Sequence, residues 1–572
     1  MPTVAQRRSA LESLQGAWVP KTIAQALDAA AMRWPDRPLV IGDAHAWTYA
    51  EVQRVSREIA AGLMALGIGP GDHVAILLAN YPEYVALKYA IARIGAVAVP
   101  INFSLRRNEL NYILGQSDSK VLVTMDRFRD RNYLEDLDAL IPGWPSAGGG
   151  SSLPRLHHVL VFPTGAPVER HDHRTLASLR DLGTSVSPSA LSSLERNADP
   201  HARSDIVYTS GTTGLPKGVM LTHDMILRAA YASAYTRAFE DARRVMFALP
   251  MYHVFGYVEC LVACTFVGGA IIPQVAFDAQ AMLDGAQAHG ANELVCVPTM
   301  TLKLLELAAA QGFDGSRLTA FFNSGGISPP PIWQRIRDAF GAREVLTGYG
   351  MTETTASTAC TLPEESDEHL LNSNGRFKDA GIAGDPALQG VLALYKTIDP
   401  LTGADLPPGA SGELVAKGPI VTSGYYKKDE ETHVAFTPDG WLHTGDIGVV
   451  TADGYVTLTG RLKETYRCGG EMVMPREIED LLLSYPGVAH ALAVGVPDPK
   501  MGEVGCVCIV RSSDTHPTAE ELLDFCREHL ARFKVPRHVL FLTESDIPTT
   551  ATGKAQKFKL TELARRRLAE RA

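Results

Sequence analysis

Residues 206–218 read Ile-Val-Tyr-Thr-Ser-Gly-Thr-Thr-Gly-Leu-Pro-Lys-Gly and hold the most informative pattern in the chain. The first three residues predict a strand, and a helix is predicted to begin at Thr222. The loop between them combines four hydroxyl groups, the ammonium of Lys217 and glycines that let backbone amides face an anion. It is not a Walker A loop, because Gly218 follows the lysine where that motif has Ser or Thr. The pattern favours a phosphate-binding loop over a plain surface turn.

The residues before this loop alternate between helical and strand patterns. Helices are predicted at residues 22–33, 48–64 and 81–95, and strands at 38–41, 73–78, 97–101 and 121–123. This β-α-β-α order predicts a mostly parallel sheet that is covered by helices, and a second round of the same kind runs from 206 to about 346. Residues 126–200 are less regular and contain a predicted surface loop at 148–152.

The pattern changes in the last third of the chain. Short β-runs separated by Gly, Pro and Asp predict a β-rich subdomain at residues 414–458. A smaller α+β pattern follows, with helices at 475–484 and 518–531 and strands at 489–495 and 505–511. We therefore predict an α/β fold. Its large N-terminal domain of mixed α/β subdomains plus the β-rich subdomain spans 1–462, and a small α+β C-terminal domain spans 463–572.

Composition and charge exclude several classes of protein. The chain has 572 residues, 46% of them hydrophobic, and a net charge of −10, which indicates a globular protein and argues against a nucleic-acid partner. The basic residues near the C-terminus, at 557–567, are predicted to form the solvated face of a last helix. The eight cysteines show no zinc spacing, and Cys506 and Cys508 are expected on one face of a buried strand. No transmembrane segment or signal peptide is predicted, so a cytoplasmic location is expected.

Further motifs follow the phosphate-binding loop in a fixed order, and together with it they resemble those of the adenylate-forming superfamily. This superfamily includes acyl- and aryl-CoA synthetases, luciferases and the adenylation domains of peptide synthetases. The motifs are residues 349–353 (Tyr-Gly-Met-Thr-Glu), 440–446 (Gly-Trp-Leu-His-Thr-Gly-Asp), 460–464 (Gly-Arg-Leu-Lys-Glu), 469–471 (Gly-Gly-Glu) and 550–554 (Thr-Ala-Thr-Gly-Lys).

The resemblance implies an AMP-binding (adenylation) domain at 1–462 and a mobile AMP-binding-associated domain at 463–572. The second domain would turn about a hinge at Lys463. The implied substrates are ATP, coenzyme A and a small carboxylic acid, with Mg²⁺ as the metal. The residues that the motifs assign to ATP or AMP are Thr209, Ser210, Gly211, Thr212, Thr213, Gly214, Lys217, Ser324, Gly325, Gly326, Tyr349, Gly350, Thr352, Asp446, Arg461 and Lys554.

Each implied role makes chemical sense. Lys217 and the loop hydroxyls would hold the β- and γ-phosphates, and Glu353 would hold Mg²⁺, a cation that prefers carboxylate and phosphate oxygens. Asp446 would accept hydrogen bonds from both ribose hydroxyls, because a carboxylate offers two oxygens. Lys554 would bridge the reacting carboxylate and the α-phosphate, which Thr352 would also reach. The remaining assignments are Arg461 at the ribose or phosphate, Ser324, Gly325, Gly326 and Tyr349 at the adenine, and Gly469, Gly470 and Glu471 on the CoA side.

The segment 250–256 (Pro-Met-Tyr-His-Val-Phe-Gly) resembles the motif that lines the acyl pocket in this superfamily. His253 stands where members that activate amino acids carry an aspartate. A buried ammonium would therefore lack a partner, which disfavours an amino-acid substrate. His253 would gate the pocket or assist thioester formation, or it is simply packed in the interior. Small and apolar residues near the predicted tunnel favour a fatty or aryl acid, and the chain looks most like medium- and long-chain fatty acyl-CoA synthetases.

The hinge region departs from the superfamily pattern. Met472 and Val473 follow Glu471 where Asn and Ile are usual, Glu464 replaces an aspartate, and residues 466–468 are unusual. These positions lie where the small domain would meet the thiol. They leave open whether the acceptor is CoA or the phosphopantetheine arm of an acyl-carrier protein. A non-catalytic nucleotide-binding paralogue is a further alternative, and the sequence allows an oligomer.

Overall fold

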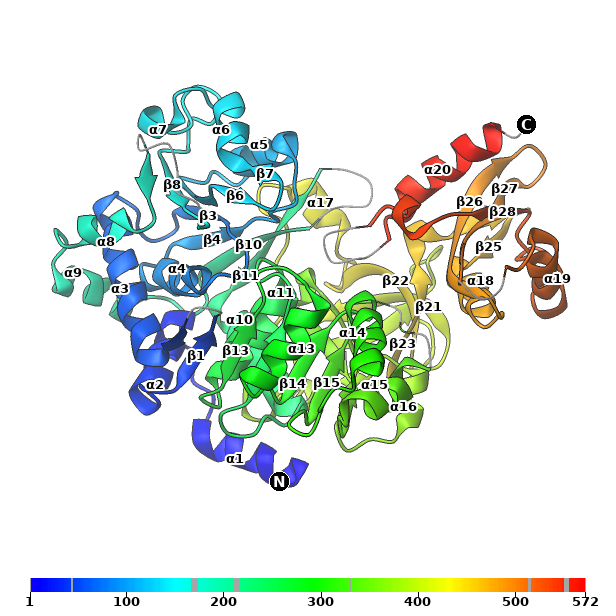
Figure 1. The fold of residues 1–572 in the computed structure, drawn as a ribbon, viewed down its shortest axis with the longest axis horizontal. Coiled ribbons are helices and arrows are strands. Elements are labelled where there is room, and N and C mark those ends of the chain that lie inside the picture. The colour runs from blue at the N-terminus through cyan, green and yellow to red at the C-terminus, as the bar shows by residue number, and fades with distance from the viewer. Residues whose placement is uncertain are drawn as a thin grey trace.

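In the computed structural model, the described residues are 2–42, 45–165, 173–209, 215–326, 328, 331–512, 516–549 and 555–570. They form a large N-terminal lobe and a small C-terminal lobe, which lies at the right of the view in Figure 1. The buried apolar residues likewise separate into two clusters, one within 11–456 and one within 466–564. The predicted boundary at 462/463 falls between these clusters and stays a prediction.

The first sheet of the large lobe has seven strands in the order β11-β10-β4-β3-β5-β8-β9. All neighbours are parallel except β10 and β11. Its strands are β3 (His73–Leu77), β4 (Val97–Pro100), β5 (Val121–Met125), β8 (His158–Phe162), β9 (Arg174–Thr175), β10 (Arg203–Thr209) and β11 (Lys217–Thr222).

The prediction that the phosphate-binding loop joins a strand directly to a helix was wrong. The loop joins the antiparallel strands β10 and β11, and helix α10 (His223–Thr236) begins only after them. A side chain at Gly218 would lie 2.5 Å from Ile206 Cγ2, so the glycine that looked like part of a turn is needed where the strands meet. The predicted helix start is confirmed, because the Thr222 side chain caps α10 by accepting from the Met225 N–H.

The second sheet also has seven strands, in the order β16-β15-β14-β12-β13-β1-β2. Only the β1–β2 pair is antiparallel. The predicted strand at 38–41 therefore belongs to the sheet of the second round and not to that of the first. Its strands are β1 (Pro38–Ile41), β2 (Ala46–Thr48), β12 (Arg244–Phe247), β13 (Ala270–Pro273), β14 (Glu293–Cys296), β15 (Ala320–Asn323) and β16 (Glu344–Leu346).

The predicted helices of the first round are confirmed as α2 (Ile23–Arg33), α3 (Tyr49–Ala65) and α4 (Pro82–Arg93), and the first two begin with capping boxes. The segment 126–200 is irregular, as predicted. In the predicted surface loop at 148–152, residues 150–152 are exposed, but Gly148 and Gly149 are buried, so the prediction was wrong for these two. Its elements are β6 (Arg127–Phe128), β7 (Arg131–Asn132), α6 (Tyr133–Leu140), α7 (Trp144–Ala147), α8 (Ser178–Gly183) and α9 (Pro188–Asn197). The other helices of the large lobe are α1 (Val4–Gln15), α5 (Arg107–Gln116), α11 (Val254–Gly256), α12 (Ala263–Thr265), α13 (Ala279–Ala288), α14 (Pro298–Gln311), α15 (Ile332–Phe340), α16 (Asp367–Asn372) and α17 (Asp429–Val434).

Two antiparallel sheets follow in the chain, and the predicted β-rich region at 414–458 lies in the second of them. The first contains β17 (Gly348–Met351), β18 (Ala356–Cys360) and β19 (Arg376–Phe377). The second contains β20 (Leu394–Ile398), β21 (Ser411–Lys417), β22 (Leu442–Val450) and β23 (Val456–Arg461). In Figure 1 this second sheet lies between the large parallel sheets and the C-terminal lobe.

The described residues of the C-terminal lobe form a five-stranded sheet with three α-helices and a 3-10 helix (Glu544–Asp546). Cys506 and Cys508 are buried free thiols in β27, and all eight cysteines of the chain are free and buried. No helix in the described part of the chain is long and apolar enough to cross a membrane. The elements are β24 (Tyr466–Cys468), β25 (Glu471–Val473), α18 (Pro475–Leu483), β26 (Val488–Asp498), β27 (Gly502–Arg511), α19 (Ala519–His529), β28 (His538–Phe541) and α20 (Lys557–Ala569).

Candidate functional site

A strained turn lies at the centre of the site. Strands β17 and β18 are joined by a short 3-10 helix (Thr352–Thr354), followed by Thr355 at φ 64° and Ala356 at φ 152°. Residues with a Cβ rarely adopt such angles, and they persist only where the surrounding structure holds them. The Thr355 hydroxyl donates to the Ile420 carbonyl at 2.6 Å. The turn therefore presents Thr352 in a fixed position beside Glu353.

Glu353 is buried and held at both ends. Its backbone carbonyl accepts from the Thr422 N–H at 2.8 Å, and its Oε1 accepts from the Tyr425 hydroxyl at 3.0 Å. Burial raises the pKa of the Glu353 carboxyl, while the Tyr425 hydrogen bond and the positive charges of Lys217 and Arg461 oppose that rise. Lys217 and Arg461, which belong to two other quoted motifs, are thus near enough to influence this carboxylate.

Lys217 lies beside the same tyrosine. Its Nζ is 4.1 Å from the centroid of the Tyr425 ring, and the Thr209 hydroxyl donates to its carbonyl at 3.4 Å. Burial lowers the pKa of Lys217, Glu353 raises it, and the nearby charge of Lys463 lowers it. Tyr425 contacts both Lys217 and Glu353, yet the sequence motifs did not single it out. In the sequence, Tyr425 is marked only by its place in an aromatic pair that follows Gly424.

Asp446 is 4% exposed and already uses both carboxylate oxygens. Oδ2 accepts from the Tyr349 hydroxyl at 2.7 Å, and Oδ1 lies 3.0 Å from Arg461 Nε. The two residues of the ion pair face each other across β22 and β23. The structure thus brings together three predicted nucleotide-binding residues that lie up to 112 positions apart in the sequence.

Three glycines lie in the segments that the motifs assign to the adenine. Gly325 has φ +83°, and a Cβ at Gly326 would lie 3.2 Å from Pro298 Cδ. A Cβ at Gly350 would lie only 1.9 Å from the Ala356 carbonyl oxygen, so β17 and β18 can approach there only because a glycine is present. Ser324 is buried and its hydroxyl donates to the Gly348 carbonyl at 2.7 Å, which joins the segment 324–326 to β17.

The predicted acyl-pocket motif adjoins this segment. His253 caps the short helix α11, where its Nδ1 accepts from the Phe255 N–H at 3.3 Å. A Cβ at Gly325 would lie 3.2 Å from Val297 Cγ1 and 3.6 Å from the Phe255 ring, so apolar side chains border the predicted adenine segment. A π-helix (Tyr257–Val262) follows α11 directly. Such helices are rare and are frequent at functional sites.

The small lobe contributes the predicted hinge and CoA-side residues. Lys463 is exposed in a 3-10 helix (Leu462–Glu464) next to the large lobe. Gly469 and Gly470, at φ 62° and 91°, form the two-residue turn between β24 and β25, a turn that needs positive φ at both positions. Glu471 follows this turn and is exposed. Within the described residues, no hydrogen bond or ion pair joins this turn to Glu353 or Asp446.

Some predicted site residues lie outside the described residues: Ser210, Gly211, Thr212, Thr213, Gly214 and Lys554. An isolated β-bridge joins Thr549 to Ala555, on either side of the segment that contains Lys554. Lys557 follows, and its Nζ lies 2.7 Å from Glu479 and 3.1 Å from Glu464. The prediction of a solvated basic face was therefore wrong at Lys557. Its ion pair with Glu464, the residue after the predicted hinge Lys463, links the start of α20 to the hinge region.

Glu353 is the acidic residue of the site that fits a magnesium ion bound together with a triphosphate. The described residues contain no cluster of three or more His, Cys, Asp or Glu side chains that could hold a metal ion. Glu353 supplies a single buried carboxylate. Magnesium commonly binds one or two carboxylates together with phosphate oxygens and water, so these residues fit Mg²⁺ bound with a triphosphate.

Comparison with known families gives two matches that together span most of the chain. Residues 27–426 match the family described as AMP-binding enzyme, and residues 477–554 match the AMP-binding enzyme C-terminal domain. The first match alone covers more than half of the chain.

Individual proteins are similar over nearly their full length. The YngI protein of Bacillus subtilis (strain 168), which carries the name of an acyl-CoA synthetase, is 34% identical over 95% of this chain and 96% of its own. The mitochondrial medium-chain acyl-CoA ligase ACSF2 of Danio rerio is 32% identical over 96% of this chain and 89% of its own. The crystal structure of ATP-bound MatB from Rhodopseudomonas palustris superimposes with a TM-score of 0.79 at 26% identity, covering 95% of this chain and 99% of that one.

Proposed function

Since the chain belongs to the AMP-binding enzyme family, we propose that it is an ATP-dependent acid–thiol ligase acting on a hydrophobic carboxylic acid. It adenylates the acid and transfers the acyl group to CoA, releasing AMP and pyrophosphate. The observation that carries the proposal is the grouping of motif residues at the buried carboxylate of Glu353. Tyr425 contacts both this carboxylate and Lys217, and Arg461, whose charge also acts on it, is paired with Asp446.

The first step joins two anions. An oxygen of the substrate carboxylate attacks the α-phosphorus of ATP, the bond from that phosphorus to the bridging oxygen breaks, and pyrophosphate leaves. Catalysis is then mainly positioning and charge stabilisation. In our proposal Lys217 holds the β- and γ-phosphates, Thr352 reaches the α-phosphate and Lys554 neutralises charge at the reacting oxygens. Magnesium, held through Glu353, supplies charge neutralisation on the phosphates.

The second step needs a thiol at the activated carbonyl. The thiolate attacks that carbon, and AMP leaves with the oxygen that came from the acid. We place the turn of Gly469 and Gly470, with Glu471, on this side of the reaction. In the described structure this turn has no polar contact with the nucleotide residues, so its role requires the small lobe to turn about Lys463.

The surroundings of Gly325 support a hydrophobic acid. A Cβ at Gly325 would contact Val297 and Phe255, and a Cβ at Gly326 would contact Pro298. His253 holds its own helix terminus through Nδ1, and it supplies no negative charge for a substrate ammonium. We therefore propose a fatty or aryl acid as the substrate and leave an amino acid as the disfavoured class.

A panel of acids tests the function. Pyrophosphate release is measured with ATP and fatty, aryl or amino acids, in the presence and absence of CoA. We expect release with a hydrophobic acid and conversion of CoA to its thioester. Adenylation without any CoA thioester would redirect the second step to a carrier protein. No release with any acid would instead favour a non-catalytic nucleotide-binding protein.

Proline at position 463 tests the hinge. Proline fixes φ and restricts the residue before it, so it opposes rotation of the link between the lobes. In Lys463→Pro we expect thioester formation to fall by roughly tenfold more than adenylation, as a gating step predicts. Lys463→Ala is the matched control, because it removes the same side chain and leaves the backbone free. Equal losses in both half-reactions of the proline variant would contradict the hinge assignment.

A further inference from the structure

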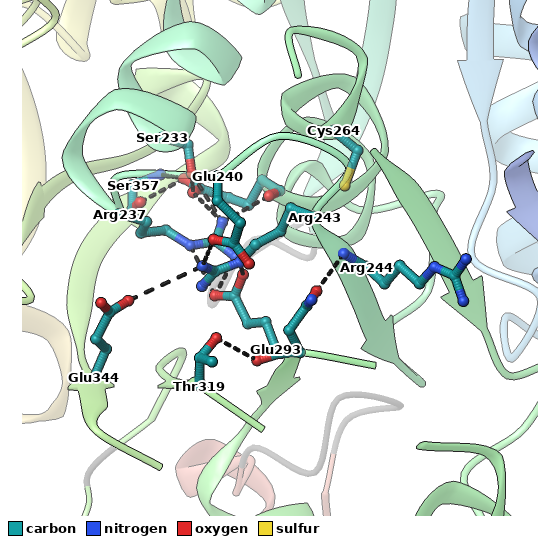
Figure 2. A network of polar contacts seen from close by, with 12 residues as sticks. Ser233, Arg237, Glu240, Arg243, Arg244, Cys264, Glu293, Thr319, Glu344 and Ser357 are labelled. Carbon is teal, nitrogen blue, oxygen red and sulfur yellow. Dashed lines mark hydrogen bonds and ion pairs between the residues drawn. The ribbon is translucent and has the colours of Figure 1, made fainter. Parts of the chain in front are cut away.

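A buried network of charges lies behind the site. Figure 2 shows Arg237 and Arg243 beside Glu293, with Ser233 and Ser357 close by. Arg237 donates to Glu293 Oε1 through Nε at 3.0 Å, and Arg243 donates to Glu293 Oε2 at 3.0 Å. The two arginines and Glu293 are all fully buried. Buried charges of this kind are costly unless each is paired, so the network strongly fixes the segments that carry it.

Glu259 is the member of this network that reaches the site. It lies in the π-helix that follows His253, and its side chain is fully buried. Its Oε1 accepts from the Ser357 N–H at 2.8 Å, and Lys378 Nζ lies 3.1 and 3.2 Å from its two oxygens. The hydroxyls of Ser233 and Ser357 donate to the same carboxylate. The charges of Lys378 and Arg237 hold the pKa of Glu259 below its usual value despite burial, so it is a carboxylate.

The π-helix provides a second link to the same network. A widened helical turn changes which carbonyl groups find partners inside the helix. The backbone carbonyl of Glu259 accepts from Arg237 Nη1 at 2.7 Å, and Arg237 is itself paired with Glu293. Residue 259 is therefore held through its main chain and through its side chain at once.

Ser357 connects this carboxylate to the strained turn. It follows Thr355 and Ala356, the two residues with positive φ, and it pairs with Gly350 across β17 and β18. A strained turn keeps its conformation only when groups outside it hold its ends. Glu259 accepts the backbone N–H of Ser357, the first residue after that strained pair.

We propose that Glu259 is a positioning residue for adenylation, which sets the turn of Thr352 and Glu353 against the acyl-side helix that begins after His253. The inference rests on the proposed function. Glu259 makes two parts of the site move as one unit. One is the segment that borders the acid, and the other is the turn that would face the α-phosphate and magnesium. Loss of this link shifts the reacting groups relative to each other while leaving the ribose contacts of Asp446 intact.

Two double variants separate positioning from stability. In Glu259→Gln with Lys378→Met, the amide oxygen can still accept from Ser357, and no ammonium is left unpaired. In Glu259→Met with Lys378→Met, the charges are removed equally but the acceptor is lost. We expect the second variant to show a kcat for acid-dependent pyrophosphate release roughly 30-fold below the first, since a displacement of about 1 Å can cost about 100-fold. The KM for ATP should differ much less than kcat, because Lys217 and Asp446 keep their positions in both variants.

Further controls address folding and function. Glu344→Gln breaks ion pairs at the far end of the network, with Arg7 and Arg243, and is expected to lower Tm without changing kcat. Glu259→Asp keeps the charge but moves the carboxylate away from Ser357, so it should lower kcat. It replaces the double variant Glu259→Met with Lys378→Met as the test if that protein does not fold. Equal kcat values for the two double variants, or wild-type kcat in Glu259→Asp, would overturn the positioning role. Absence of acyl-AMP formation in the wild type would instead overturn the proposed function.

Discussion

Lys554→Ala is expected to lower the rate of acyl-AMP formation by about 1000-fold, while thioester formation from supplied acyl-AMP keeps most of its rate. Two negative groups must approach in the first half-reaction, and a positioned cation is worth most where charge shifts between them. The second half-reaction joins a thiol to a neutral carbonyl and has less need of that cation. The measurement is single-turnover formation of acyl-AMP, followed in a separate reaction by its conversion to the thioester.

Lys559→Ala is the matched control for this variant. Lys559 lies on α20 and is exposed, so its loss changes net charge equally without touching the proposed site. It should leave both half-reactions unchanged. Equal losses of both half-reactions in Lys554→Ala would refute the assignment of this lysine to one step.

Asp446→Ala is expected to raise the KM for ATP by roughly 100-fold. Hydrogen bonds to a charged group contribute about 1.5–3 kcal/mol each, and about 1.4 kcal/mol corresponds to tenfold in affinity. The variant also leaves the buried hydroxyl of Tyr349 and the guanidinium of Arg461 without the carboxylate that each contacts. Initial rates at varied ATP, with the acid saturating, give the KM directly.

Asp453→Ala provides the control, because Asp453 is an exposed aspartate in the turn between β22 and β23. Its loss should leave the KM for ATP at the wild-type value. If Asp446→Ala also kept the wild-type KM for ATP, Asp446 would not contact the ribose.

Local sequence patterns predicted the elements that depend on local physics. The helix starts at Thr22, Thr48 and Thr222 were predicted correctly. A threonine hydroxyl just before a helix caps it through local hydrogen bonds, which do not depend on where the helix packs in the fold. The α/β class was predicted from segments with the apolar spacing of a helix that alternate with segments typical of a strand. Strand β11 was missed, because the sequence 216–218 has turn composition and only its pairing with β10 makes it a strand. The strand at 38–41 was assigned to the wrong sheet, since local pattern carries no information about which distant strand is its neighbour.

In the site too, local motifs identified some residues, and contacts between distant segments determine the others. The motifs brought Asp446, Arg461 and Tyr349 to attention, and the structure places them in contact. Tyr425 and Glu259 carried no such signal. Two of the partners of Glu259, Ser357 and Lys378, lie 98 and 119 positions away in the chain, and the sequence shows Glu259 as a lone acid in an apolar run. Pairing across such separations follows from the packed fold.

Transfer of oxygen from the acid to AMP tests the central claim most directly. The acid is labelled with ¹⁸O in its carboxylate, and the nucleotide product is analysed by mass spectrometry after one round of reaction with ATP and CoA. Attack of the carboxylate on the α-phosphorus predicts AMP that carries one ¹⁸O atom, together with unlabelled pyrophosphate. Unlabelled AMP, or label found in inorganic phosphate with ADP as the nucleotide product, would contradict an acyl-adenylate intermediate.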